Sequence, residues 1–196
     1  MTRRIPVAAG AALLLPTAAV SAQSGQPYSV QGSAFATTMS VGEKVVGGMG
    51  VEFQLRDNDL VATRRGVLSA GLGVQATSHS RGADRINLRG LFLEPRYTFA
   101  LRSERWFPYA AARLALLQQD ANFATSSSGF GAGLGGGLVY GIARRVNLDL
   151  GGALLRQSFG DAEYTRAGPF LGGAVTFPAF TGYALKVGVN IGLGSG

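Results

Sequence analysis

The residues that could carry out catalysis in this chain are few, and they lie around its single histidine. His79 stands between Ser78 and Ser80, and Asp84 is the nearest acid in the sequence. A serine hydrolase needs a histidine within hydrogen-bond reach of the serine and an acid that orients the histidine. No spacing in the sequence brings these groups together. We therefore interpret them as a polar cluster at the end of a strand, with catalysis as the alternative.

Cysteine chemistry is excluded because the chain has no cysteine, which removes disulfides, thiolate metal sites, thiol nucleophiles and a lipidated cysteine. No group of histidine and acidic residues has the spacing of a metal site. Glycine runs such as 131–135 lack the strand-to-helix context of a phosphate-binding loop. We expect no catalytic residue, no metal and no cofactor.

The remaining charged residues fall within segments of alternating polarity, and these segments must position them. From Tyr183 to Leu193, every second residue is large and apolar, and the residues between are small or polar. Such alternation is typical of a β-strand with one apolar face. Eight segments of this kind follow one another: residues 28–37, 47–57, 66–79, 90–101, 107–118, 129–142, 146–154 and 183–194.

Segments of this length suit a transmembrane barrel, because a tilted strand of about ten residues crosses the hydrocarbon core of a bilayer. A helical span needs roughly 18 or more apolar residues, and residues 23–196 contain no such stretch. Only closed barrels and helices satisfy every backbone polar group in lipid. The sequence therefore predicts an all-β fold, an eight-stranded antiparallel up-and-down transmembrane barrel with apolar faces outward.

The first 22 residues have the pattern of a secretory signal peptide. Arg3 and Arg4 precede an apolar run, and Val20-Ser21-Ala22 is a small-residue cleavage site. Pro16 and the short apolar run disfavour the alternative of a membrane anchor. We predict a signal peptide over 1–22, a barrel domain over 23–196, and export to the outer membrane of a Gram-negative-type bacterium. Cleavage would leave 16 basic and 11 acidic residues, a net charge of +5. This balance favours an anionic lipid surface over nucleic acid as a partner.

Charged residues on the inward faces predict a polar network inside the barrel. Because an unpaired buried charge is costly, we expect these residues to pair and to plug the lumen. The alternative is a set of independently hydrated charges in an open channel. Glycines at alternate positions of 129–137 suit a narrow lumen. The network residues are Glu52, Glu94, Arg96 and Arg113 near the middle of their strands, with Asp149 and Lys186 nearer strand ends.

Connections between the predicted strands differ in length on the two sides of the barrel. One side has short connections at 103–104 and 143–145 and a longer one at 57–65; the other has 38–46, 79–85, 120–127 and 160–181. The last connection is rich in apolar residues. It could extend a barrel hairpin, hold an extra pair of short strands or bind a partner. Aromatic residues near strand ends predict a girdle: Tyr28, Tyr97, Phe99, Tyr140 and Tyr183.

The end of the chain resembles the barrel-insertion signal of outer-membrane barrels, with Lys186, Gly188, Ile191 and Leu193 at the signal positions. Leu193 replaces the usual terminal aromatic residue, and three residues follow it. Together with 93–97, 108–114 and 145–150, this segment makes the chain similar to the OmpA/OmpX-type small outer-membrane barrels.

The resemblance implies insertion by the barrel-assembly machinery and contact with outer-membrane lipid and lipopolysaccharide. We also expect a monomer whose exterior loops could meet an extracellular partner. The function predicted is a structural or surface-interaction role. A narrow channel for small solutes and a lipid A-modifying enzyme, a deacylase or acyltransferase, are the alternatives.

Overall fold

A computed structural model describes residues 26–41, 44–101, 103, 105–163, 174–175 and 179–194. Among these residues there is no helix with the length and hydrophobicity of a membrane span. Eight long strands are β1 (Tyr28–Val41), β2 (Lys44–Thr63), β3 (Gly66–Arg81), β4 (Asp84–Phe99), β5 (Trp106–Ala121), β6 (Ala124–Ala143), β7 (Val146–Phe159) and β10 (Phe180–Leu193). Two short strands are β8 (Ala162–Glu163) and β9 (Ala174–Val175).

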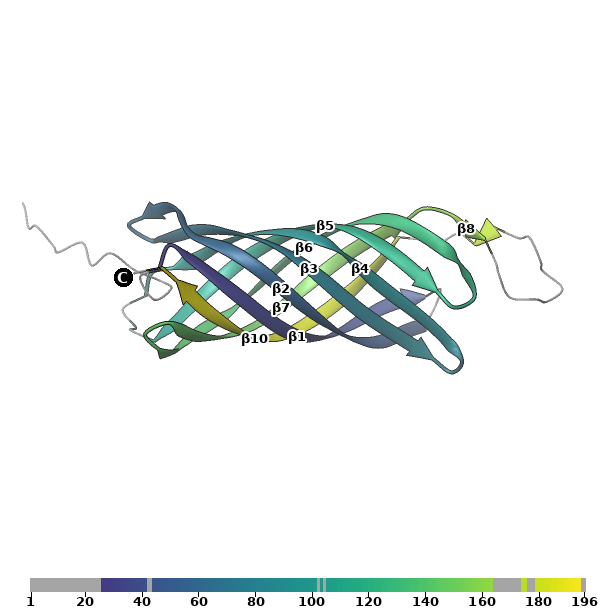
Figure 1. Cartoon of the computed structure of the whole chain (residues 1–196), viewed down its shortest axis with the longest axis horizontal. Helices are drawn as coiled ribbons and strands as arrows, with labels where there is room; N and C mark the ends of the chain where they lie inside the picture. The colour runs from purple at the N-terminus through teal and green to yellow at the C-terminus, as the bar shows by residue number, and fades with distance from the viewer. Residues whose placement is uncertain are drawn as a thin grey trace, which may run out of the picture.

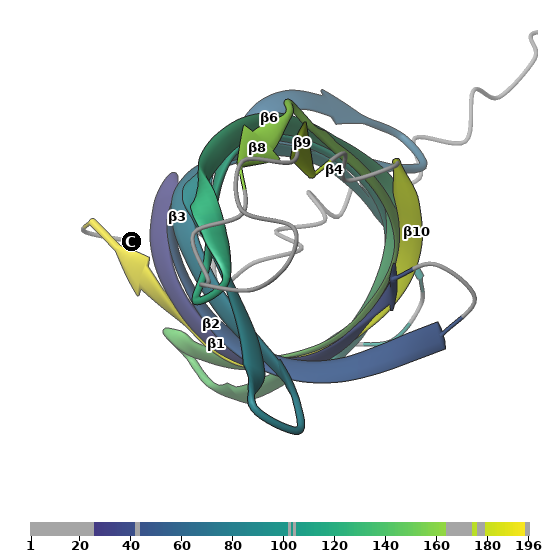
Figure 2. The ribbon, with the colours of Figure 1, turned by 90° about the vertical axis from the view of Figure 1, so that its right-hand side faces the viewer.

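The eight long strands form a closed barrel, in which each strand pairs antiparallel with its two neighbours (Figures 1 and 2). The ring runs β1-β10-β7-β6-β5-β4-β3-β2, and it closes where Tyr28 lies opposite Leu193. Closure leaves no edge strand whose backbone groups would need other partners. The structure confirms the predicted eight-stranded antiparallel barrel.

The two ends of the barrel carry different connections. We call the end that holds Tyr28, Leu193 and the turns β2–β3, β4–β5 and β6–β7 the terminus end (Figure 1). The opposite end holds the connections β1–β2, β3–β4, β5–β6 and β7–β10, and we call it the distal end. The strands lead alternately from one end to the other, so residues of similar depth come from distant parts of the chain.

Several predicted connections are strand in the structure, so the sequence-based expectation of longer loops was wrong there. β2 continues to Thr63 through a register shift between Asp57 and Val61, and only Gly82 and Ala83 separate β3 from β4. Gly82 has a φ of 59°, a conformation that glycine adopts without strain. In the segment 160–181, β8 pairs with β9. The predicted signal peptide over 1–22 and most of the segment 160–181 lie outside the described residues.

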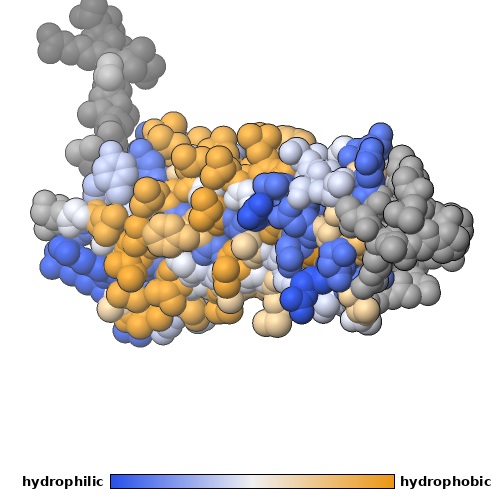
Figure 3. Space-filling model, turned by 45° about the vertical axis from the view of Figure 1, so that its right-hand side comes forward, coloured by the Kyte–Doolittle hydropathy of each residue, from blue (hydrophilic) through white to orange (hydrophobic). Residues whose placement is uncertain are grey.

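The outer surface of the barrel is apolar over the half nearer the terminus end (Figure 3). Large apolar side chains from neighbouring strands point outward and stay exposed. Leu185 is 71% exposed and Leu72 is 64% exposed. The same belt includes Met49, Val51, Phe53, Leu55, Val74, Leu91, Leu93, Leu114, Leu116, Leu134, Leu154 and Val187. A continuous exposed apolar surface of this kind marks a face that another apolar phase covers.

Polarity inverts in the distal half of the barrel. On β4, Arg85, Asn87 and Arg89 point outward and are exposed, whereas Ile86 and Leu88 point inward and are buried. The inward apolar side chains of this half form one cluster, which includes Met39, Val46, Leu117, Phe159 and Phe180. The distal half is therefore polar outside, and inside it holds an apolar cluster together with buried polar residues such as His79 and Gln119. The half near the terminus end has the opposite arrangement.

Candidate functional site

Inward-facing charges in the middle of the barrel form one connected set of ion pairs. Strand alternation turns every second side chain into the lumen, and the charged positions of five strands share this parity. All six residues predicted for the lumen belong to the set, and Arg56 and Tyr109 join it. We call these eight residues the lumen network: Glu52 and Arg56 on β2, Glu94 and Arg96 on β4, Tyr109 and Arg113 on β5, Asp149 on β7 and Lys186 on β10.

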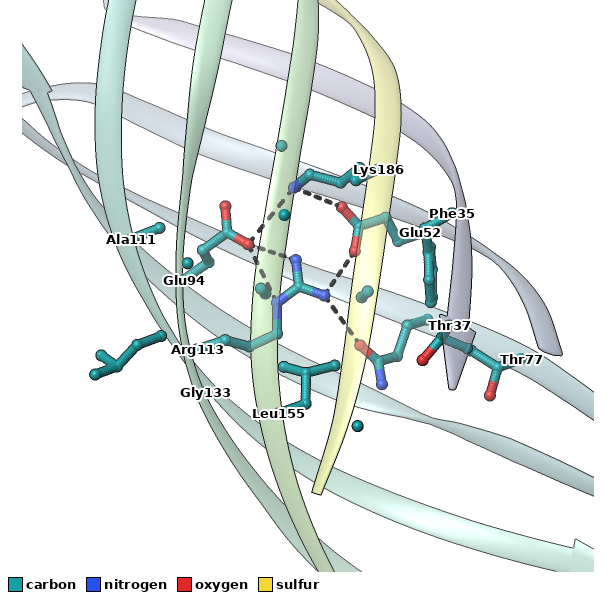
Figure 4. Close-up of a pocket in the computed structure, with 18 of the residues that line it drawn as sticks. Phe35, Thr37, Glu52, Thr77, Glu94, Ala111, Arg113, Gly133, Leu155 and Lys186 are labelled. Atoms are coloured by element: carbon teal, nitrogen blue, oxygen red, sulfur yellow. Dashed lines mark hydrogen bonds and ion pairs between the residues drawn. The ribbon is translucent and has the colours of Figure 1, made fainter. Parts of the chain in front are cut away.

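Arg113 joins three strands through its guanidinium group (Figure 4). Its Nη1 donates to Glu52 Oε2 at 2.7 Å and to Gln75 Oε1 at 3.2 Å. Its Nε donates to Glu94 Oε2 at 3.1 Å, and Nη2 also donates to Glu94. The guanidinium carbon lies 4.0 Å from the centre of the Phe92 ring, which adds a cation–π contact. The Phe92 ring thus contacts one face of the guanidinium group, and the hydrogen-bond acceptors lie along its edge.

Lys186 connects the network across the full width of the barrel. Its Nζ lies 3.0 Å from Glu52 Oε1 and 3.7 Å from Glu94 Oε2 (Figure 4). In the ring of eight strands, β10 and β4 stand opposite each other. The ion pair between Lys186 and Glu94 therefore spans the lumen instead of following its wall.

The ion pairs of Arg113 and Lys186 with Glu52 and Glu94 form a first layer of the network. Arg96 and Asp149 form a second layer, which lies nearer the terminus end. Arg96 Nη1 donates to Asp149 Oδ2 at 2.7 Å, and Arg96 Nη2 donates to Glu94 Oε1 at 2.9 Å. The Tyr109 hydroxyl donates to Asp149 Oδ1 at 2.8 Å, and the Arg96 guanidinium stacks on the Tyr109 ring at 3.8 Å. The side chains of Arg96 and Asp149 have no exposed surface. Glu94 belongs to both layers and links them.

Arg56 is a network residue that the sequence reasoning missed. Its Nη2 donates to Glu94 Oε1 at 2.7 Å and to Gln54 Oε1 at 3.1 Å, and its Nη1 donates to Ser69 Oγ at 3.1 Å. The predicted strand ended at residue 57, which placed Arg56 at a rim. Its inward parity with Glu52 and Gln54 was the available signal.

Pairing between opposite charges explains why the network holds together away from water. Four cations face three carboxylates, and Glu94 contacts all four cations: Arg56, Arg96, Arg113 and Lys186. Burial of an isolated charge is strongly unfavourable, whereas a paired and hydrogen-bonded charge is tolerated. Glu94, which is 4% exposed, is therefore the residue on which the other charges depend most.

Glycines on β6 and β7 leave room for Tyr109. A Cβ atom at Gly151 would lie 2.3 Å from the Tyr109 hydroxyl oxygen, and one at Gly137 would lie 2.6 Å from it. At Gly137 the same atom would also lie 2.2 Å from the carbonyl oxygen of Leu150. The absence of side chains at Gly137 and Gly151 thus leaves space for the Tyr109 side chain to reach Asp149.

A cavity of about 50 Å³ extends from the network toward the distal end. Thr77, Gln157, Phe180 and Lys186 are among the residues that line it. Among the described residues, none hydrogen-bonds to Thr77 Oγ1 or to Gln157 Oε1. One water needs roughly 10–15 Å³ of such space, so the cavity has room for about three to five waters.

The catalytic alternative does not assemble at the rim. His79 points into the lumen and is 2% exposed, whereas its neighbours Ser78 and Ser80 point outward and are exposed. Successive residues of a strand face opposite sides, so the imidazole cannot activate either serine hydroxyl. Asp84 is exposed at the distal end and is separated from His79 by the β3–β4 turn. His79 is therefore not part of the rim cluster that we expected.

The residues of the predicted insertion signal lie along β10. Ile191 and Leu193 face outward, and Lys186 and Gly188 face the lumen. A Cβ atom at Gly188 would lie 2.3 Å from Ser33 Oγ, so β1 packs closely there. Within the described part of the chain, no cluster of three histidine, aspartate or glutamate side chains could hold a metal ion.

A closed eight-stranded antiparallel barrel with an apolar outer belt and a charged interior is the architecture of small outer-membrane barrels. Solved structures of this class are similar to the chain. Neisserial surface protein A superposes with a TM-score of 0.65 at 17% identity, covering 85% of this chain and 97% of that one. The outer membrane enzyme PagL gives 0.50 at 17% identity, covering 84% and 99%. No protein-family model and no curated protein sequence matches the chain.

Proposed function

We propose that the protein is a non-conducting outer-membrane barrel of a Gram-negative-type bacterium, with a structural or surface-interaction role and no enzymatic activity. The observation that carries this proposal is the lumen network, whose ion pairs cross the barrel between strands far apart in the ring. The sequence expectations of a monomer, of insertion by the barrel-assembly machinery and of contact with lipopolysaccharide belong to the same proposal.

Membrane insertion is supported by the exposed belt. Side chains such as Leu185 and Leu134, each 71% exposed, gain free energy when they leave water for hydrocarbon. The closed ring of strands satisfies the backbone as a bilayer requires. A soluble barrel that binds an apolar ligand would carry its apolar residues inside along the whole length, and this barrel does so only in its distal half.

A closed lumen is supported by the burial of the network. Arg56, Arg96 and Asp149 are at most 1% exposed, as expected of side chains packed in a closed lumen. Eight strands enclose an interior that side chains just fill. The apolar cluster of the distal half lies in the same lumen and adds to this support.

An exterior surface role is supported by the distal half, where the strands continue beyond the belt with polar outward faces. Arg89 and Asp120 form an exposed ion pair of 3.3 Å on this surface. With no cysteine in the chain, a single introduced cysteine tests the orientation. We expect Ala83→Cys to react with a membrane-impermeant maleimide on whole cells, and Arg144→Cys to react only after lysis.

Single-channel recording in planar bilayers tests the closed lumen. We expect silence from the wild type and discrete openings from Arg113→Ala, because that change removes the larger of the two cations that join Glu52 to Glu94. Arg89→Ala, which alters an exposed outer arginine, serves as the control and stays silent. Stable openings in the wild type would instead favour the narrow channel. Silence in both would assign the block to the apolar cluster of the distal half.

A further inference from the structure

Exposed arginines gather at the turns of the terminus end. They are Arg64 and Arg65 between β2 and β3, Arg105 before β5, and Arg144 and Arg145 between β6 and β7, and we call them the terminus-end arginines. None of them forms an ion pair with another described residue, although several ion pairs form elsewhere in the barrel. Their charge is therefore available to a partner outside the protein.

Aromatic side chains mark the level just inside these arginines. Trp106 is 44% exposed and packs against Tyr140 with ring centres 4.4 Å apart. Tyr97 and Phe99 meet edge to face at 5.1 Å, and Tyr28 is 57% exposed nearby at the start of β1. Exposed tryptophan and tyrosine beside an apolar belt mark the headgroup level of a bilayer. The terminus-end arginines lie in the connections beyond these strand ends, and this places them at the level of the lipid phosphates.

The terminus end has a larger excess of positive charge than the distal end, so an anionic lipid would prefer the terminus end. Within the described residues, the terminus end combines the five arginines with two acids, Asp57 and Asp59. The outer surface of the distal half combines three arginines with four acids: Arg85, Arg89 and Arg156 with Asp84, Asp120, Asp161 and Glu163. Two further basic residues, Lys44 and Arg81, stand at the distal ends of β2 and β3. Among the described residues, the terminus end thus has the larger excess of basic over acidic residues.

We propose that the terminus-end arginines bind the phosphates of anionic phospholipids in the leaflet that surrounds this end. The inference rests on the proposed membrane insertion and adds a lipid preference to it. A guanidinium group binds phosphate through parallel hydrogen bonds, and each basic residue near an anionic surface strengthens the attraction. The occupant is an anionic diacyl lipid such as phosphatidylglycerol, because the aromatic rings beside the arginines need acyl chains to contact.

The single tryptophan makes this lipid preference measurable, because Trp106 directly follows Arg105. Protein expressed from the full chain is purified and placed in mixed phosphatidylcholine and phosphatidylglycerol vesicles. A spin-label quencher near the headgroup is carried, at equal mole fraction, by one lipid or by the other. We expect phosphatidylglycerol to be enriched around Trp106 on the order of threefold. High salt should reduce this enrichment.

Substitution of all five terminus-end arginines by glutamine is expected to abolish the enrichment, and Arg144→Gln with Arg145→Gln to reduce it. The matched control, Arg85→Gln with Arg89→Gln and Arg156→Gln, keeps it. Heat-modified gel mobility verifies that each variant is folded. Equal quenching by both lipids in the wild type, or enrichment that survives the five substitutions, overturns the lipid preference while insertion stands. Absence of quenching by either lipid refutes insertion itself, and the lipid preference with it.

Discussion

Removal of the Glu94 charge is the sharpest perturbation of the lumen network. Glu94→Gln preserves the size of the side chain but leaves four buried cations facing two carboxylates, Glu52 and Asp149. Arg56 at 2.7 Å and Arg96 at 2.9 Å would both lose a charged acceptor. Loss of one partner from a buried ion pair costs about 3–5 kcal/mol, so we expect a decrease of that size in the free energy of unfolding.

Urea unfolding of the protein in lipid vesicles, followed by Trp106 fluorescence, measures this decrease. Asp59→Asn is the control, because Asp59 is exposed and forms no ion pair with a described residue; a surface change of this kind stays within about 0.5 kcal/mol. A double-mutant cycle with Arg113→Met should give a coupling energy of about 1–3 kcal/mol. A loss below about 1 kcal/mol, or additive single effects, would refute the view that Glu94 connects the two layers.

Two further changes test the close packing at Gly137 and the second layer of the network. Gly137→Ala places a Cβ atom 2.2 Å from the Leu150 carbonyl oxygen and should lower stability by about 1–3 kcal/mol, whereas Gly32→Ala, with no atom within 4 Å, should not. Equal urea midpoints for the two variants would contradict the steric argument. Tyr109→Phe removes the hydroxyl that donates to Asp149 and should cost about 1.5–3 kcal/mol, with Tyr140→Phe as the control. An unchanged midpoint for Tyr109→Phe would mean that Arg96 alone satisfies Asp149.

The alternation of apolar and polar residues predicts the barrel and its inward faces, because side chains that contact lipid in the belt must be apolar. Where lipid lies outside, the apolar residues of a strand face outward, as Leu91 and Leu93 do. The residues that alternate with them must then face the lumen. That rule places Glu94, Arg96 and Arg113 inside without knowledge of the fold. It fails in the distal half, where Arg85 was expected in a connection and the next strand was predicted to begin only at residue 90. The polar outward faces and apolar inward faces of this half reverse the expected pattern.

Contacts between strands that are not neighbours lie beyond any pattern along the chain. Tyr109 reaches Asp149 across β6, and this contact depends on the space that Gly137 and Gly151 leave. Arg56 depends on the continuation of β2 past Asp57, where a register shift sustains pairing that the local sequence does not predict. The facing of residues within the apolar belt can thus be inferred from the sequence, whereas contacts across the lumen depend on the closed ring of strands.

The reversal of polarity along the barrel has a mechanical consequence in a bilayer. Displacement toward the distal side would bring belt leucines into water, and displacement the other way would draw Arg85 and Arg89 into hydrocarbon, where arginine becomes costlier with depth. Both directions are opposed, so the polarity of the barrel surface by itself defines one preferred immersion depth. Above that depth the distal hairpins keep an apolar core of their own, built around residues such as Leu88 and Phe159. They would form a stiff rim that projects to the same height above the bilayer in every copy.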